Sequence, residues 1–223
     1  MKCYVALVMI FLALSAEAQE GFRPVDRDQV KKAVSDGQAA TGYKQLLSRF
    51  EAFDATLTQE DFRLLYYGFV FQGGFSAYPE EHKKEINQAL NDNDLNKAIG
   101  FCDEVLKKYP ISLAANYYKG LAIFRADTSN KDYIKYRDRY RGLVDAILSS
   151  GDGLTCETGY RVISVSDEYM IIYTRFKVEE FKGQALVSHC DRLTVKPSEA
   201  WPKEQVYFDA TEILKKEADL FGH

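Results

Sequence analysis

The sequence predicts an α+β fold: an N-terminal helical bundle, then a small antiparallel sheet packed against it, then a C-terminal helix. From Val25 to about Ser149 the apolar residues recur every three or four positions, which is the period of a helix. Beyond Gly151-Asp152-Gly153 they recur every two, the period of a strand, and "TEILKKEADLF" (211–221) returns to the helical period. We therefore expect a bundle over 19–150 and a sheet region over 151–223, forming one cooperative unit.

The first eighteen residues have the pattern of a secretory signal peptide. One Lys precedes an apolar run from Cys3 to Leu14, and small side chains at Ala16 and Ala18 flank a cleavage point before Gln19. The run is shorter than the roughly 20 residues that a bilayer-spanning helix needs. The sequence therefore predicts a protein that is cleaved after Ala18, reaches the periplasm or the exterior, and keeps no membrane span.

The charge distribution argues against a nucleic-acid partner. The formal net charge is -4, and the 28% of charged residues carry both signs. One segment, "KDYIKYRDRYR" (131–141), interleaves basic and Tyr residues as some nucleic-acid sites do. Its Tyr positions continue as an apolar stripe at helical spacing, so we interpret it as an amphipathic helix.

Capping and breaking residues set the ends of the bundle's earlier helices. An apolar stripe over 43–53 precedes Thr58, whose side chain suits the N-cap of a helix that would run to Gly73-Gly74. Pro79 is expected to open the next helix. That helix should end at 91–93, "NDN".

The stretch "DLNKAIGFCDEVLKKYPISLAANYYKGLAIF" (94–124) resembles a tetratricopeptide hairpin. Ala98, Cys102 and Pro110 match the second helix of such a repeat, and Tyr117 with Gly120 matches the opening of the next. The pattern has no further copy, so we expect an incomplete repeat within a compact bundle rather than a solenoid. In this phase Cys102 faces the neighbouring helix and should be buried and reduced.

Four short runs follow the Gly-Asp-Gly turn and are rich in β-branched and aromatic residues. Such closely spaced strands predict an antiparallel sheet that needs the bundle to cover one face, with Tyr169, Ile171 and Phe208 against helices. Any ligand groove should then lie where the sheet meets the bundle, near the Gly-Asp-Gly turn. The runs are "YRVISV" (160–165), "EYMIIYTRF" (168–176), "QALVSHCDRLTV" (184–195) and "EQVYFDA" (204–210).

Four separated phrases resemble a family of exported Bacteroidetes proteins that is known only as a domain of unknown function. The resemblance covers nearly all of the mature chain and brings no catalytic residues. The phrases are "LYYGFVFQ" (65–72), "SGDGLTCETGYRVISVSDEY" (150–169), "GQALV" (183–187) and "VYFDAT" (206–211).

The cysteines leave one question open. Cys3 lies in the predicted signal peptide and Cys102 in a core position, so Cys156 and Cys190 are the remaining disulfide candidates, with two free thiols as the alternative. A thiol enzyme would need His189 as its base. On a strand His189 and Cys190 point to opposite faces, and a Cys156–His189 pairing is geometrically open but has no support in the sequence.

No catalytic set, metal site or cofactor motif is expected. "EEHKKEI" (80–86) has one His where a helical metalloprotease motif needs two, and the Gly-Asp-Gly turn lacks the spacing and Lys of a phosphate-binding loop.

The aromatic phrase "LYYGFVFQGGFSAYPEE" and the hairpin are the sequence's best prospects for binding. Aromatic rings anchor peptides and stack on sugars, although core packing competes as an explanation. The leading hypothesis is a non-catalytic scaffold of the cell envelope that binds a protein or peptide; the alternatives are an envelope hydrolase with a carboxylate-based site and a glycan-binding protein. The candidate binding residues are Tyr66, Tyr67, Phe71, Phe75, Tyr78 and Tyr117.

Overall fold

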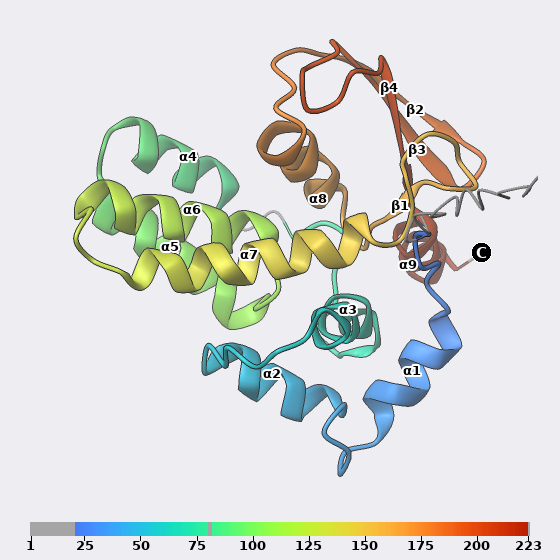
Figure 1. The fold of residues 1–223 in the computed structure, drawn as a ribbon, viewed down its shortest axis with the longest axis horizontal. Helices are drawn as coiled ribbons and strands as arrows, with labels where there is room; N and C mark the ends of the chain where they lie inside the picture. Colours follow the sequence, from blue (N-terminus) through green and yellow to red (C-terminus); the bar gives the residue numbers. More distant parts are fainter. Residues whose placement is uncertain (1–20, 80–81, 223) are drawn as a thin grey trace, which may run out of the picture.

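The structure is a computed structural model that describes residues 21–79 and 82–222. The predicted signal peptide therefore lies outside the described residues. The α+β prediction is confirmed, because helices fill the first part of the chain and a four-stranded sheet with a C-terminal helix follows (Figure 1). Among the described residues, no helix is both long and apolar enough to cross a membrane.

The elements follow one another with short connections. The helices of the first part are α1 (Arg27–Ser35), α2 (Tyr43–Glu51), α3 (Gln59–Gly68) with the 3₁₀ turn η1 (Phe69–Phe71), α4 (Lys83–Asn91), α5 (Leu95–Lys108), α6 (Leu113–Ala126) and α7 (Asp132–Leu148). The second part contains β1 (Tyr160–Arg161), α8 (Val165–Met170) with the π-helical turn η2 (Ile171–Arg175), β2 (Phe181–Val187), β3 (Cys190–Val195), β4 (Gln205–Asp209) and α9 (Thr211–Phe221).

Two helix ends differ in how well the sequence predicted them. Thr58 caps α3 as predicted: it accepts a hydrogen bond from the Asp61 backbone N–H, and the Asp61 side chain accepts one from the Thr58 backbone N–H. The prediction that Pro79 opens the next helix is wrong. α4 begins at Lys83, because His82 has a φ of 60° and a left-handed residue cannot continue a right-handed helix.

The hairpin formed by α5 and α6 packs between α4 and α7. Asp94 and Ser112 cap the two helices, and α5 ends at Lys108, just before Pro110. Cys102 is a free, fully buried thiol, as predicted. Burial raises its pKa to about 12, so it stays protonated.

The sheet is mixed rather than purely antiparallel. Its strand order is β1-β4-β3-β2, with β1 parallel to β4 and the other neighbours antiparallel. The strand predicted over 168–176 is wrong, since this segment forms α8 and η2. Ser164 caps α8, and Asp167 and Glu168 lie in its first turn, where acidic side chains favour a helix start.

One hydrophobic core extends from α1 to α9 through both parts of the chain. α8 lies between the sheet and the helices, in contact with α6 (Figure 1). Ile171 and Phe208 are fully buried, as expected, whereas Tyr169 is half-buried against the rings of Phe181 and Tyr173. The continuous core is the packing expected of one cooperative unit.

Candidate functional site

Three carboxylates lie together where α8 meets the inner face of the sheet. Asp167 and Glu168 come from the first turn of α8, and Asp191 comes from β3, where it lies between Leu186 of β2 and Phe208 of β4. Asp167 is 4% exposed, Glu168 0% and Asp191 9%. Among the described residues, none of the three forms an ion pair with Lys or Arg. We call them the acidic cluster.

Asp167 is held by a tyrosine from the bundle. The Tyr66 hydroxyl donates to Asp167 Oδ2 at 2.7 Å and accepts from the Ile163 backbone N–H at 3.1 Å. Burial raises the pKa of Asp167 to about 7, while the hydrogen bond from Tyr66 opposes the rise. Near neutral pH this carboxyl is therefore divided between its protonated and ionised forms.

Among the described residues, neither carboxylate oxygen of Glu168 has a hydrogen-bond partner. Burial raises its pKa well above the ordinary value, and the charges of Asp191 and Asp167 raise it further. Glu168 therefore favours its protonated form beside Asp191. We call Glu168 and Asp191 the carboxyl pair.

Tyr78 lies at the solvent-facing rim near the acidic cluster. Its side chain is 47% exposed, and its hydroxyl donates to Glu217 of α9. The pKa of Tyr78 is raised to about 12, first by that hydrogen bond, then by burial and by the charges of Glu217, Asp191 and Glu168. It is the most exposed of the predicted binding residues.

The other predicted binding residues lie deeper. Tyr66 and Tyr67 are buried in the core, and the Tyr67 hydroxyl donates to the Arg161 carbonyl oxygen at 3.2 Å. The remaining three, Phe71, Phe75 and Tyr117, are half-buried. Phe71 lies 4.6 Å from the Arg27 guanidinium, Phe75 packs on Phe69, and Tyr117 packs on Tyr118 and Tyr140.

The sequence did not reveal the acidic cluster. The predicted strand began at Glu168 and left Asp167 in the turn before it, so the two were not expected on one helix. The pattern Ser164-x-x-Asp167 before an apolar run was the available signal for a helix start. Nothing in the sequence indicated that Asp191 lies beside that helix.

The outermost strand, β2, carries exposed apolar side chains. Leu186 is 58% exposed and Val187 is 37% exposed. Beside the strand the rings of Tyr173, Tyr169 and Phe181 form an aromatic ladder, with centroids 6.4 and 5.6 Å apart. The Tyr169 hydroxyl donates to Gln184 Oε1 of β2 at 2.7 Å, which joins the ladder to the strand.

Cys156 and Cys190 form a disulfide, which settles the alternative that the sequence left open. It joins the loop after α7 to the start of β3. The sulfur and ring nitrogen atoms of Cys156, His189 and Cys190 lie within 4.8 Å of one another. Since the two sulfurs are bonded to each other, they are not available as metal ligands in this form.

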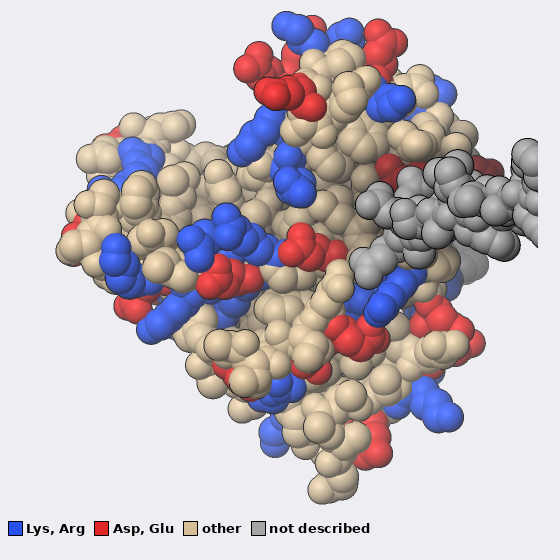
Figure 2. All heavy atoms as spheres, in the orientation of Figure 1, with Lys and Arg blue, Asp and Glu red and all other residues tan. Residues whose placement is uncertain are grey.

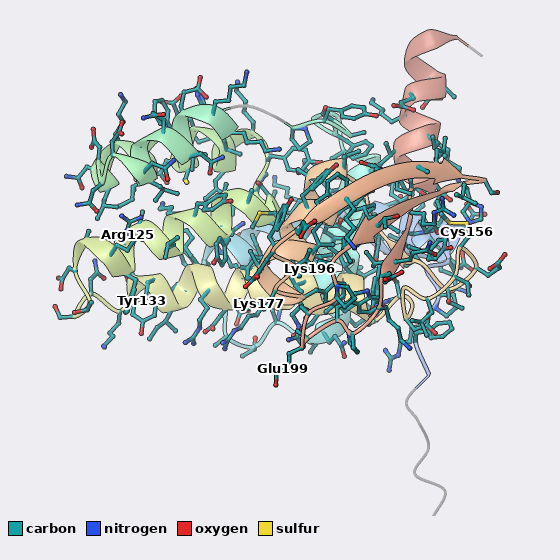
Figure 3. All side chains as sticks on the ribbon, turned by 90° about the horizontal axis from the view of Figure 1, so that it is seen from above. Arg125, Tyr133, Cys156, Lys177, Lys196 and Glu199 are labelled. Carbon is teal, nitrogen blue, oxygen red and sulfur yellow. A yellow bond between two sulfur atoms is a disulfide. The ribbon has the colours of Figure 1, made fainter. Side chains whose placement is uncertain are left out.

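Two surface hollows lie away from the acidic cluster. One, of about 720 Å³, lies at the Gly-Asp-Gly turn, where a groove was expected; its carboxylate, Asp152, already accepts hydrogen bonds from the Leu154 backbone and the Thr158 hydroxyl. The other, of about 610 Å³, is lined by Lys177, Lys196 and Glu199, which Figure 3 labels. Neither brings together groups suited to catalysis.

The acidic cluster is buried, whereas the accessible surface lies elsewhere, along β2. Glu168 has no contact with solvent, so its carboxyl group cannot touch a substrate in this conformation. The β2 strand offers exposed side chains and a sheet edge. On the face drawn in Figure 2, basic and acidic side chains are interspersed.

Comparison with known proteins identifies a family. No curated protein and no solved structure matches the chain. The model of a family described as "Domain of unknown function (DUF4919)" matches residues 28–219, a range that includes all four phrases that carried the family resemblance. The chain belongs to this family.

Proposed function

We propose that this protein is an exported, non-catalytic binding module of the cell envelope that captures an extended segment of a protein or peptide along β2. Export is supported by the signal-peptide pattern of residues 1–18, and a disulfide is the form of cysteine expected in an oxidising compartment. N-terminal sequencing of the mature protein from its native host should give Gln19 first. A chain that begins at Met1 in the cytoplasm would contradict export.

The observation that carries the binding proposal is the free edge of β2. This strand ends the sheet, and among the described residues it pairs with β3 alone. Proteins usually protect such edges with charged residues or bulges. Here Lys182 and a bulge protect the first part of the strand, but 184–187 ("QALV") pairs regularly with β3 and carries no charge.

Side chains beside the edge indicate what kind of segment would bind. An added strand forms main-chain hydrogen bonds, and side-chain contacts at alternate positions give specificity. Leu186 and the aromatic ladder offer apolar and ring surface next to 184–187. We therefore expect a ligand segment that is extended, uncharged and apolar at alternate positions.

The carboxyl pair favours a second candidate, the envelope hydrolase. Glycosidases use a pair of carboxyl groups, one of them protonated, and Glu168, whose pKa is raised, lies beside Asp191. That activity would require α8 to move away from β3, because Glu168 is fully buried. The closed pair and the open edge together support binding over hydrolysis.

A peptide-display experiment tests the proposal. The mature chain, residues 19–223, is immobilised and used to select random linear peptides, and the Kd of an enriched peptide is measured. Leu186→Lys should weaken binding at least about tenfold, because a charge at the edge opposes strand addition. Phe124→Lys is the matched control: Phe124 is 41% exposed on α6, and its Kd should equal that of the wild type.

Other results would favour the competing functions. Enriched peptides that bind Leu186→Lys as tightly as the wild type would rule out capture along β2. Hydrolysis of a glycan or peptide that disappears in Glu168→Gln would favour the hydrolase. Binding of an envelope glycan that is lost in Tyr173→Ala, but kept in Leu186→Lys, would favour the glycan-binding alternative.

A further inference from the structure

The two sulfurs of the Cys156–Cys190 disulfide have different surroundings. Cys156 is half-buried in the loop after α7, whereas Cys190 is fully buried at the start of β3. Figure 3 shows Cys156 at the opposite end of the molecule from Arg125 and Tyr133. An external thiol can therefore approach Cys156 but cannot reach Cys190.

A histidine lies beside the accessible sulfur. The ring nitrogens of His189 are 3.8 and 3.9 Å from Cys156 Sγ. His189 is exposed in the two-residue turn between β2 and β3, so water can reach its ring. A protonated imidazole at this distance stabilises a thiolate on Cys156 once the disulfide is opened.

Cys190 has the opposite environment. Its sulfur lies 3.1 Å from the Cys156 carbonyl oxygen, which can accept a hydrogen bond from the thiol. Burial also disfavours the charged thiolate. The reduced protein would thus hold one exposed sulfur poised to ionise and one buried sulfur that stays protonated.

We propose that Cys156–Cys190 is a thiol–disulfide exchange site that oxidises a dithiol of a partner protein, with His189 as the positioning residue. A partner thiolate attacks Cys156 Sγ. A new disulfide forms between that sulfur and Cys156, the Cys156–Cys190 bond breaks, and its electron pair goes to Cys190, which takes up a proton.

The second step completes a two-electron transfer. The partner's other thiolate attacks the partner sulfur of the mixed disulfide and releases Cys156 as a thiolate beside His189. The partner dithiol becomes a disulfide, this protein becomes a dithiol, and the two partner protons pass to Cys190 and to the Cys156–His189 pair. A leaving thiolate that is stabilised in this way leaves faster and favours the reduced protein.

The inference stands apart from the proposed binding function, although the geometry connects them. The carbonyl oxygen of Val187, the last residue of β2, lies 3.4 Å from Cys156 Sγ. A segment paired with β2 would therefore bring its own cysteine close to Cys156. The test uses small thiols and so does not depend on strand capture.

The experiment begins with the oxidised mature chain and reduced glutathione at pH 7. Mass spectrometry of the quenched protein should find glutathione on Cys156 and none on Cys190. In the reduced protein, iodoacetamide should modify Cys156 first. His189→Gln should slow that alkylation at pH 6 about tenfold, the change in thiolate fraction that one pKa unit produces.

Two further variants separate thiolate stabilisation from a structural role. His189→Lys keeps a positive charge and should restore fast alkylation, whereas His82→Ala, a change at a distant histidine, should leave the rate unchanged. Glutathione on Cys190, equal alkylation of both cysteines, or a His189→Gln rate equal to that of the wild type would each overturn the inference.

Discussion

Asp209 of β4 and Glu168 of α8 are two carboxyl groups beside the same sheet whose pKa values are shifted in opposite directions. Asp209, at the end of β4, receives a hydrogen bond from Arg161 Nε at 2.7 Å and another from the Thr211 backbone N–H at 2.9 Å. Burial acts to raise the pKa of Asp209, but the Thr211 hydroxyl and the Arg161 charge outweigh it, and the pKa falls below its ordinary value. The pKa of Glu168 rises, first because of burial and then because of the charges of Asp191 and Asp167.

The difference shows that burial alone does not determine the charge of a carboxyl group. Asp209 keeps its charge because donors and a cation surround it, so it strengthens the fold above its ordinary pKa. Glu168 favours its protonated form because it is buried and its neighbours are acidic, with no cation to offset them. One group fastens β4 to β1, and the other makes the stability of the α8–sheet contact depend on pH.

The largest expected effect comes from separating the two parts of the chain. Expressed alone, 151–223 should show no cooperative thermal transition, because its buried residues lose the bundle that covers them and Asp167 loses Tyr66. Without a folded structure, the opposite pKa shifts of Asp209 and Glu168 should also disappear. Two soluble fragments, 19–150 and 151–223, that each melt cooperatively at the temperature of their part in the intact chain would show independent domains.

Removing the cation from the first carboxylate should have the next largest effect. Arg161→Ala leaves Asp209 without its cation in a largely buried position, and we expect a loss of about 3–5 kcal/mol in the free energy of unfolding at pH 7. Urea denaturation measures this. Lys135→Ala breaks the exposed Lys135–Asp132 pair and serves as the control, with a change within about 0.5 kcal/mol.

Glu168→Gln tests the second carboxylate and should stabilise the protein. Because the folded-state pKa of Glu168 is raised above its ordinary 4.5, its contribution is fully present below pH 4.5 and is lost as the pH rises. The amide N–H of the Gln variant can donate a hydrogen bond to Asp191 at any pH, whereas the Glu168 carboxyl can donate one only while it is protonated. We expect a gain of about 1–3 kcal/mol at pH 8 and little change at pH 4.

A single result would contradict this account of the carboxyl pair. If Glu168→Gln is destabilising at pH 8 by urea denaturation, the Glu168 carboxylate must receive a hydrogen bond or a cation in the folded protein. Asp191→Asn supplies an independent check, since it also removes one of the paired carboxylates. Both variants should weaken the pH dependence of the melting temperature above pH 5.

The sequence predicted local features better than contacts between distant segments. The N-cap at Thr58 and the core position of Cys102 each follow from residue spacing within a single helix, α3 and α5 respectively. Both predictions are confirmed for that reason. The segment 168–176 was misassigned because its apolar residues fit a strand as well as a helix. Tertiary packing around Met170 and Ile171 decided between them.

The candidate sites depended on contacts that no spacing encodes. Tyr66, Asp167 and Asp191 come from three separate parts of the chain, and the acidic cluster forms where the fold joins those parts. The same holds for Cys156 and His189, which are 33 residues apart in sequence. The aromatic phrase drew attention to Tyr66 as a ligand contact, whereas the structure uses its hydroxyl to hold Asp167.

Asp167→Asn should have the smallest effect and should act in a different pH range. The folded-state pKa of Asp167 is about 7 against an ordinary 3.8, so in the wild type its contribution is full below pH 3.8 and is lost by about pH 7. The variant should remove that part of the fall in melting temperature and keep the hydrogen bond from Tyr66. The part of the slope that comes from Glu168 should remain, because burial and the Asp191 charge still raise its pKa. Differential scanning calorimetry from pH 4 to pH 9 measures the change. A curve for Asp167→Asn that parallels the wild type between pH 4 and pH 7 would show that Asp167 is ionised throughout, and it would then resemble Asp209 rather than Glu168.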